Sequence, residues 1–422
     1  MIISMKKSIF SYLIFICVTA LFTNCSISEP LEQENFFVVA YISGGEGKPL
    51  PNFDYFTHLN YAFGRPNKTF DGVDIENITR FEQIAQKKIE YNESHPTVPP
   101  RKMLLSIGGW GTGRFSEMVS DSISRNAFVL SCKDIVDKYQ IDGIDLDWEY
   151  PSSGVANISF SESDVENFTL LVKELKEVLG SSKLLTIATI CTARFIDFAQ
   201  IDDYIDFYNI MSYDMDVAPY HHSPLRRFDI SDEEFFTLFN LTDFEKLELG
   251  YLNDQKVSQM YDQMYKTPIY YLMHLSDSQL KESSFVQLRN RADSLARSLL
   301  CGQSSLQEAV MLHLSKGISP KKLTLGIPFY GKVGGGKSYP HQATFSKTGD
   351  PGNGYIVGWD SIAQVPYVAL QNGDVVFGYE DSSSISAKCN YIKERQLLGG
   401  MYWEYCIDTT FVKLVAAKLL RD

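Results

Sequence analysis

The sequence predicts one (β/α)8 barrel with two inserts. Short apolar segments alternate with longer amphipathic ones from residue 36 to the end of the 422-residue chain. The short segments are apolar on both faces, as buried parallel strands are, and there are eight of them, the number that closes such a barrel. Two doubly wound domains are the alternative for this length. They would need a linker near the middle, and the Pro/Gly/Ser-rich stretches are too short to supply one.

Residues 1–24 are predicted to lie outside the fold as a signal peptide. Two lysines precede an apolar run at 9–22, as in the first two regions of a secretory signal. A transmembrane anchor is the alternative, but the run is short and wrongly flanked for one. The stretch ends in "LFTNC", which resembles a bacterial lipobox, in which Cys25 becomes the lipidated first residue. We therefore expect an exported protein, anchored in the bacterial envelope (outer membrane or cell surface) through Cys25 or otherwise secreted, with residues 25–35 as a tether.

The catalytic domain is expected to span 36–422, and its eight strands are apolar runs bounded by turn residues. We expect them at 36–43, 58–64, 102–109, 141–149, 184–190, 207–213, 323–330 and 399–405. Helices are expected between them at 77–92, 121–139, 162–179, 305–316, 380–396 and 409–421. The helix at 162–179 has an acidic first turn, apolar residues three and four apart, and Gly180 as its end signal.

Two inserts leave the C-terminal ends of strands. Residues 226–304 separate the sixth strand from its helix and are predicted to be mainly helical. Residues 333–378 follow the seventh strand, are Gly-rich, and are predicted to form a small α+β insert. Active sites of such barrels lie at this end, so both inserts are candidate walls of a cleft. The alternative for the first insert is packing outside the barrel, because long inserts need not be lids.

Charge and cysteine content exclude several classes of partner. The formal net charge is −13, with no basic run in the body of the chain. This argues against nucleic acid or an anionic membrane surface as a partner, whereas a neutral sugar is indifferent to the charge. Seven scattered cysteines form no CxxC or Cys/His cluster. We expect no disulfide framework, no metal site and no cofactor.

Four acids lie in "DGIDLDWEYP", residues 142–151. Alternation along a strand places Asp145, Asp147 and Glu149 in one row facing the barrel interior, with neighbours about 6.6 Å apart. Confined like charges raise a carboxyl pKa, so one acid stays protonated near neutral pH. Glu149 is the expected acid, because it lies at the strand end with the longest reach, whereas Asp142 has the opposite parity and is expected to support the strand. A purely structural row is the alternative, but such perturbed clusters concentrate at functional sites.

The same stretch resembles the DxxDxDxE signature of family 18 glycoside hydrolases, the chitinases and related endo-β-N-acetylglucosaminidases. "SIGG" resembles the family's SxGG motif on the third strand, and "MSYD" its MxYD motif on the sixth. Further blocks follow in the family's order. The matching stretches are 57–63, 106–109, 142–151, 211–214, 222–225, 322–331 and 397–408. The resemblance spans about residues 36–421, apart from the insert after 225.

The resemblance implies a retaining, substrate-assisted reaction. The sugar's own 2-acetamido oxygen attacks the anomeric carbon to form an oxazolinium ion, while the enzyme protonates the leaving oxygen. It assigns the acid to Glu149, the carboxylate that holds the acetamido N–H to Asp147, and the hydroxyl that fixes the acetamido carbonyl to Tyr213. Asp145 would hold Asp147 and tune its protonation, with Ser106 as a further partner.

The resemblance also implies residues that contact the sugar. Trp403 is expected as the floor under the reacting ring, since sugar C–H faces stack on aromatic rings. Asp214 is expected to hydrogen-bond near the sugar, and Trp110 to line the cleft. For both tryptophans a core position is the alternative. Four further residues near strand ends either shape the pocket or pack in the ordinary way: Tyr41, Phe63, Met211 and Tyr330. Lys332 stands where many relatives carry Arg.

Four readings of the function remain open at this stage. The first is a hydrolase of β-1,4 linkages in N-acetylglucosamine-containing glycans, most simply chitin or chitooligosaccharides. The second has the same chemistry on the chitobiose core of N-glycans. The third is a glycan-binding protein on an inactive barrel, although such relatives usually lose the acid. The fourth, a metal-dependent hydrolase, would depend on His221 and His222, and adjacent histidines rarely ligate one ion.

Overall fold

The computed structural model describes residues 36–216, 221–227, 304–333, 338–340 and 355–421. The expected signal peptide, tether and Cys25 lie outside the described residues, as does nearly all of the expected helical insert. Within the described ranges, no helix is long and apolar enough to cross a membrane.

Eight parallel strands close into a barrel, which confirms the predicted (β/α)8 fold. β1 pairs with β14 on one side and with β2 on the other, and this double pairing closes the sheet. A short ninth strand, β3 (Val73–Ile75), extends β2 antiparallel at the edge. The barrel strands are β1 (Phe37–Ser43), β2 (His58–Pro66), β4 (Lys102–Gly108), β5 (Gly143–Asp147), β6 (Leu184–Ile190), β7 (Phe207–Met211), β8 (Leu323–Pro328) and β14 (Gly399–Trp403).

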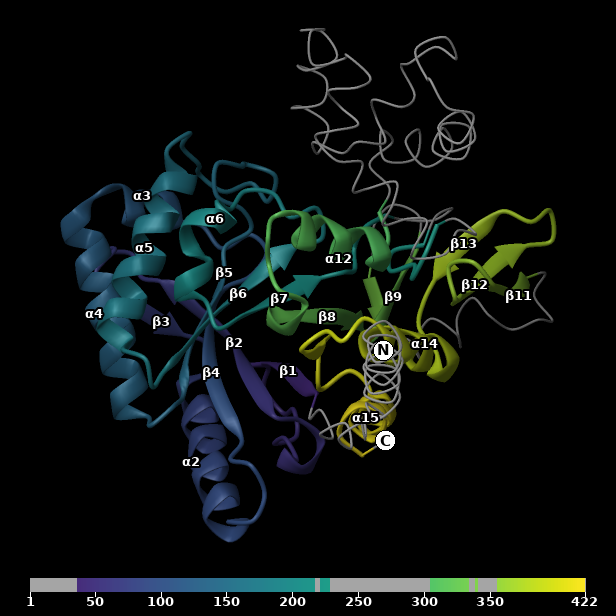
Figure 1. The fold of residues 1–422 in the computed structure, drawn as a ribbon, viewed down its shortest axis with the longest axis horizontal. Coiled ribbons are helices and arrows are strands. Elements are labelled where there is room, and N and C mark those ends of the chain that lie inside the picture. Colours follow the sequence, from purple (N-terminus) through teal and green to yellow (C-terminus); the bar gives the residue numbers. More distant parts are fainter. Residues whose placement is uncertain (1–35, 217–220, 228–303, 334–337, 341–354, 422) are drawn as a thin grey trace, which may run out of the picture. The chain divides into compact units, whose positions relative to one another are not determined.

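The predicted helices are all present outside the strands (Figure 1). Short segments α3 (Phe115–Ser120) and α6 (Phe198–Ile201) are additional. Side-chain caps begin several helices: Asn77 bonds the Arg80 N–H in α2, and Asp381 with Ser384 forms a capping box in α14. The main helices are α2 (Ile78–Ser94), α4 (Ser122–Lys138), α5 (Asp164–Leu179), α12 (Leu306–Ser315), α14 (Ser382–Glu394) and α15 (Thr409–Ala416).

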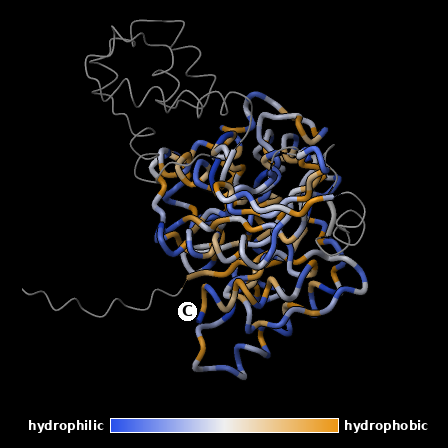
Figure 2. Tube along the Cα trace, turned by 90° about the vertical axis from the view of Figure 1, so that its right-hand side faces the viewer, coloured by the Kyte–Doolittle hydropathy of each residue, from blue (hydrophilic) through white to orange (hydrophobic). Residues whose placement is uncertain are grey.

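Alternation along each strand separates two apolar layers. In β1, Val38, Ala40 and Ile42 pack outward in the layer between strands and helices, whereas Val39 and Tyr41 face the interior. The outer layer holds most of the buried apolar side chains of the described residues, and Figure 2 colours many of the central segments as hydrophobic. The interior layer is small and contains polar side chains as well as apolar ones. Apolar packing between the strands and the surrounding helices therefore contributes most of the buried apolar contact, and the barrel interior can hold polar groups.

A second, antiparallel sheet follows the seventh barrel strand, within the region expected as the second insert. Its order is β10-β9-β13-β12-β11, and these strands with their connecting turns account for the described residues of the insert. They are β9 (Tyr330–Val333), β10 (Ser338–Pro340), β11 (Tyr355–Asp360), β12 (Val365–Leu370) and β13 (Val375–Gly378).

Candidate active site

The candidate site lies at the C-terminal end of β5. Asp145 and Asp147 face the barrel interior, while Ile144, Leu146 and Trp148 pack in the outer layer. The predicted parity of the strand is therefore confirmed. The strand is shorter than predicted, because its ladder ends at Asp147, so Glu149 lies two residues beyond it. Release from the ladder leaves Glu149 partly exposed, while Asp145 is fully buried.

Gly108 allows β4 to approach β5 closely at this end. Its φ is +135°, and a Cβ placed there would lie 1.9 Å from the carbonyl oxygen of Asp147. The next residue, Gly109, donates its N–H to that carbonyl at 2.9 Å. The "SIGG" motif is thus explained by the space and backbone freedom that glycine provides beside the acidic strand.

Asp145 is held by neutral donors on four other strands of the barrel, β1, β4, β6 and β7. Its two carboxylate oxygens accept hydrogen bonds from Tyr41 Oη (2.7 Å), Ser106 Oγ (2.7 Å), Thr186 Oγ1 (2.5 Å) and Asn209 Nδ2 (3.2 Å). Ser106 was expected as a partner, and Tyr41 proves to be one as well. Asp145 was expected to hold Asp147, but none of these four hydrogen bonds joins the two residues. Asp145 acts on Asp147 through its charge, which raises the pKa of Asp147.

Asp147 contrasts with Asp145 although it is almost as buried. Its Oδ1 has no hydrogen-bond partner among the described residues. Burial raises its pKa well above the ordinary value, and the charges of Glu149 and Asp145 raise it further. At Asp145, burial also raises the pKa, but the surrounding donors oppose the shift. The interior therefore contains one satisfied carboxyl group and one that still requires a proton or a donor.

Glu149 has the properties of a general acid. Burial raises its pKa to about 7, with a hydrogen bond from Tyr150 opposing the shift and the charge of Asp214 adding to it. Tyr150 Oη donates to Glu149 Oε2 at 3.0 Å and so fixes the carboxyl group. An acid with a pKa near the working pH transfers protons most effectively.

An aromatic floor lies across the top of the barrel interior. Trp403, at the end of β14, stacks on Phe63 with ring centroids 5.6 Å apart and an interplanar angle of 19°. Its ring also meets Tyr41 at 5.9 Å. Trp403 packs against the interior cluster and remains partly exposed. Phe63 and Tyr41 thus support the ring that is available to a ligand.

Tyr213 lies beside this floor, just beyond β7. Its hydroxyl contacts Met401 Sδ at 3.9 Å, a weak acceptor that leaves the proton available to a stronger one. Burial, followed by the charges of Asp147 and Glu149, raises the pKa of Tyr213 well above its ordinary value, so the group stays a hydroxyl. Met211 packs with the same interior cluster.

Asp214 is surrounded by three polar side chains. Tyr330 Oη donates to its Oδ1 at 2.8 Å, Lys332 Nζ lies 2.9 Å from the same oxygen, and His222 Nδ1 lies 3.6 Å away. Burial would raise the pKa of Asp214, but His222 and Lys332 outweigh it and lower the pKa. Lys332, at the position that departs from the family pattern, therefore pairs with Asp214, and Asp214 stays ionised beside Glu149.

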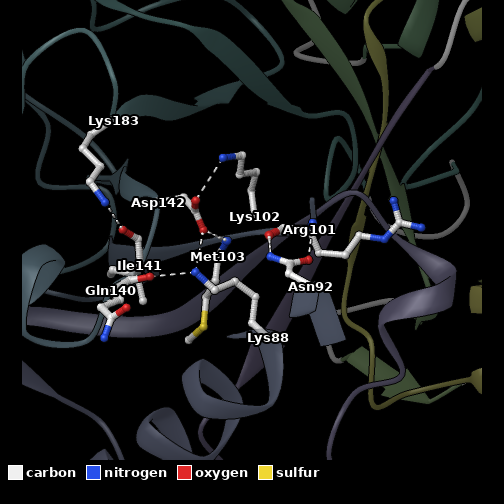
Figure 3. A network of polar contacts seen from close by, with 9 residues as sticks. All are labelled: Lys88, Asn92, Arg101, Lys102, Met103, Gln140, Ile141, Asp142 and Lys183. Atoms are coloured by element: carbon white, nitrogen blue, oxygen red, sulfur yellow. Dashed lines mark hydrogen bonds and ion pairs between the residues drawn. The ribbon is translucent and has the colours of Figure 1, made fainter. Parts of the chain in front are cut away.

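Asp142 lies at the opposite end of β5 in a different environment (Figure 3). Its carboxylate accepts hydrogen bonds from Lys88 Nζ (3.0 Å), Lys102 Nζ (3.1 Å) and the backbone N–H of Met103 (3.0 Å). Burial would raise its pKa, but these partners, Lys88 first, lower it. The expectation that Asp142 supports the strand agrees with these contacts.

Sequence reasoning missed several residues of the site. Thr186 and Asn209 complete the donors to Asp145, and Thr324 Oγ1 orients Asn209 through its Oδ1 at 2.7 Å. The available signal was parity, since Thr186 and Asn209 occupy inward positions of otherwise apolar strands. Tyr150 carried no such signal, because it lies in an irregular segment, and His222 was considered only as a metal ligand.

Two further observations concern metals and thiols. Among the described residues, no group of three His, Cys, Asp or Glu side chains is placed to hold a metal ion. The four cysteines within those ranges, Cys132, Cys191, Cys389 and Cys406, are free thiols.

A closed barrel with a buried acid row and aromatic rings at its C-terminal end fits a glycoside hydrolase. The sequence profile of glycosyl hydrolases family 18 matches residues 37–254 and 277–408, and the chain belongs to this family. Chitinase A1 of Niallia circulans is 27% identical over 393 residues, covering 84% of this chain and 46% of that protein. The chain spans roughly half the length of the curated relatives it matches.

Solved structures agree with this assignment. A family 18 N-acetylglucosaminidase from Paenibacillus barengoltzii has 25% identity and a TM-score of 0.65, covering 91% of this chain and 99% of that one. The chitinase RmChi1 from Rhizomucor miehei has 21% identity and a TM-score of 0.64, covering 92% and 100%. The second likeness shows the fold alone. The chain is therefore a member of family 18 of the glycosyl hydrolases, and relatives that it resembles are named chitinases.

Proposed function

We propose that this protein cleaves the β-1,4 bond that follows an N-acetylglucosamine residue, with retention of configuration and with the substrate's acetamido group as the nucleophile. The observation that carries the proposal is the difference between two buried acids. Asp145 accepts four hydrogen bonds, whereas Asp147 Oδ1 has no partner among the described residues. A buried carboxylate oxygen needs a donor, and the N–H of an acetamido group supplies one.

The remaining groups fit the steps of this reaction. Glu149, with a pKa of about 7, protonates the leaving oxygen. Asp147 accepts the acetamido N–H and balances the positive charge of the oxazolinium ion. The Tyr213 hydroxyl donates to the acetamido oxygen and directs it at the anomeric carbon. Water then opens the oxazolinium ion, with Glu149 as the base that receives the water proton.

The floor and Asp214 bind the sugar in this proposal. Trp403 offers a ring face to the apolar C–H face of the reacting sugar, and Phe63 and Tyr41 keep that ring in place. Asp214, ionised by its contact with Lys332, accepts a sugar hydroxyl. Chitin oligosaccharides are the simplest substrates with acetamido groups at every ring. The chitobiose core of N-glycans contains the same bond and is the second substrate to compare.

The decisive experiment compares chitohexaose with its fully deacetylated counterpart. We expect cleavage of the first with initial release of the β-anomer, and no turnover of the second, because it lacks the nucleophile. An N-acetylglucosamine thiazoline, which imitates the oxazolinium ion, should inhibit. Equal turnover of both hexamers, or release of the α-anomer, would contradict the mechanism. A parallel profile on high-mannose N-glycans shows which of the two substrates is preferred.

A further inference from the structure

A pocket of about 350 Å³ opens beside Trp110, just beyond β4. It is lined by Arg65, Trp110, Gly111, Thr112, Gly113 and Arg114. Trp110 is 64% exposed, so it is not a core residue. The loop that carries it starts at Gly109, whose N–H bonds the Asp147 carbonyl oxygen. The pocket is therefore attached directly to the acidic strand.

Among the described residues, the lining carries two guanidinium groups and no carboxylate, in a chain of net charge −13. Arg65 Nη2 pairs with Glu76 Oε2 at 3.0 Å, and both side chains are well exposed. Such a surface pair contributes less than about 1 kcal/mol, so a ligand can replace Glu76. Arg114 donates from Nη1 to the Pro66 carbonyl at 2.9 Å and makes no ion pair with any carboxylate in the described ranges.

The backbone at Arg114 adds a second reason to regard its side chain as functional. Its φ is +74°, in the left-handed region that glycine adopts without cost. Non-glycine residues held in this region cost on the order of 1–3 kcal/mol and cluster at functional sites. The loop has glycine at 111 and 113 but arginine here. Thr112 Oγ1 bonds the Gly108 carbonyl at 2.7 Å, which fixes the loop on β4.

We propose that this pocket binds the carboxylate of an acidic sugar adjacent to the N-acetylated sugar that is cleaved. The planar guanidinium fork matches a carboxylate in two parallel hydrogen bonds, and the exposed Trp110 face accepts the apolar face of the same ring. The preferred substrates are therefore glycans in which N-acetylglucosamine is linked to a uronic acid. This inference rests on the proposed function, since it specifies the neighbour of the cleaved sugar.

The test uses a hyaluronan hexasaccharide, in which N-acetylglucosamine alternates with glucuronic acid, and its carboxyl-reduced form. The two differ only at C6 of each glucuronic acid ring, which is a carboxylate in one and a hydroxymethyl group in the other. Binding to the full chain carrying Glu149→Gln is measured by calorimetry at low salt, where no cleavage interferes. We expect the acidic form to bind about tenfold tighter, the size of a charge-assisted hydrogen bond. The difference should shrink as salt is added.

Variants of the pocket residues should lower or raise the preference for the acidic hexasaccharide, depending on the charge that each removes. Arg65→Gln, or Arg114→Gly, which suits the positive φ and so retains the fold, should each reduce the preference for the acidic hexasaccharide. Glu76→Gln frees Arg65 and should increase it. Lys133→Gln removes the same charge on α4, in an exposed pair with Asp137, and should leave the preference unchanged.

Two outcomes separate this inference from the function on which it rests. Equal affinity for the two hexasaccharides overturns the acidic pocket, and cleavage of chitohexaose by the wild-type protein then leaves the proposed function intact. If the acidic hexasaccharide binds more tightly but the wild-type protein cleaves neither hyaluronan hexasaccharide nor chitohexaose, the pocket is supported and the proposed reaction is contradicted. A preference that Lys133→Gln reduces as much as Arg65→Gln would also overturn the inference, because net charge alone would explain it.

Discussion

Carboxyl groups lie at both ends of β5, and their surroundings shift their pKa values in opposite directions. At the N-terminal end, Asp142 lies between Lys88 and Lys102, and its pKa is lowered. At the C-terminal end, Asp147 and Glu149 have no cation within contact among the described residues, and their pKa values are raised. Burial acts in the same direction at both ends, so the difference comes from the partners.

The comparison separates stability from chemistry. A lowered carboxyl pKa stabilises the fold at neutral pH, and that stabilisation is lost as pH falls through the folded pKa. A raised pKa has the opposite sign: folding becomes less favourable as pH rises from the ordinary carboxyl value to the folded one. The C-terminal end of β5 therefore retains protons at the expense of stability, whereas the N-terminal end anchors the strand.

The largest expected effect comes from removing the acid. Glu149→Gln should lower kcat on chitohexaose by about 10³-fold, within the range of a lost general acid, while binding of the oligosaccharide is retained. The matched change at the other end, Asp142→Asn, should leave kcat unchanged and reduce stability. Comparable loss of kcat in both variants would show that the two ends do not divide these roles.

A smaller effect is expected from removing Lys88, the buried lysine that contacts Asp142 at the N-terminal end of β5. Lys88 Nζ is buried and donates to Asp142 Oδ2 and to the Gln140 carbonyl at 2.7 Å. Lys88→Met should lower the free energy of unfolding by about 3 kcal/mol, as for a buried ion pair that loses one partner. Urea unfolding measures this loss.

The control for Lys88→Met is an exposed ion pair. Lys133→Met breaks the pair with Asp137 on α4 and should cost less than about 1 kcal/mol. The pH dependence of kcat should be the same in both variants. A change of that profile in Lys88→Met would mean that the two ends of β5 are coupled.

The smallest effect is expected at the cation nearest the reacting end. The kcat of the wild-type protein should fall as pH rises through about 7, because Glu149 must be protonated. Lys332→Gln leaves the charge of Asp214 less compensated, so the pKa of Glu149 rises and the alkaline limb moves to higher pH. We expect the pKa of Glu149, and with it the alkaline limb, to rise by less than about 1 pH unit, which is the shift that a directly adjacent charge produces.

Lys183→Gln is the matched control for this shift. Lys183 Nζ donates to the Ile141 carbonyl at the N-terminal end of β5 (2.7 Å, Figure 3), so its loss should leave the limb in place. Movement of the limb to lower pH in Lys332→Gln would contradict the role assigned to Asp214. The two profiles, recorded on chitohexaose, compare one lost charge at each end of the strand.

Much of the fold could be predicted from the sequence because strand and helix periods are local properties. Each of the eight strands lies at its predicted place, and alternation correctly divided Asp145 and Asp147 from Ile144 and Leu146. The C-terminal end of β5 was wrong by two residues, since the ladder with β4 stops at Gly108, where β4 itself ends.

The partners of the acids were largely beyond prediction. Thr186 and Asn209 are about 40 and 60 positions from Asp145 in the chain, and only barrel closure and register bring them to its carboxylate. Lys332 attracted notice as a departure from the family pattern, but its pairing with Asp214 depends on the approach of β9 to the loop after β7.

The sequence by itself determined the fold and the inward positions of Asp145 and Asp147, because these follow from the alternation of apolar segments and from the period along one strand. It also singled out Glu149 as the proton donor that we propose. Only the tertiary structure decided how the acids differ. Asp145 is satisfied by four hydroxyl and amide groups from other strands, Asp142 by two lysines, and Asp147 Oδ1 by none of the described residues. A carboxyl pKa depends on the groups within a few ångströms of it, and chain folding alone brings those groups there.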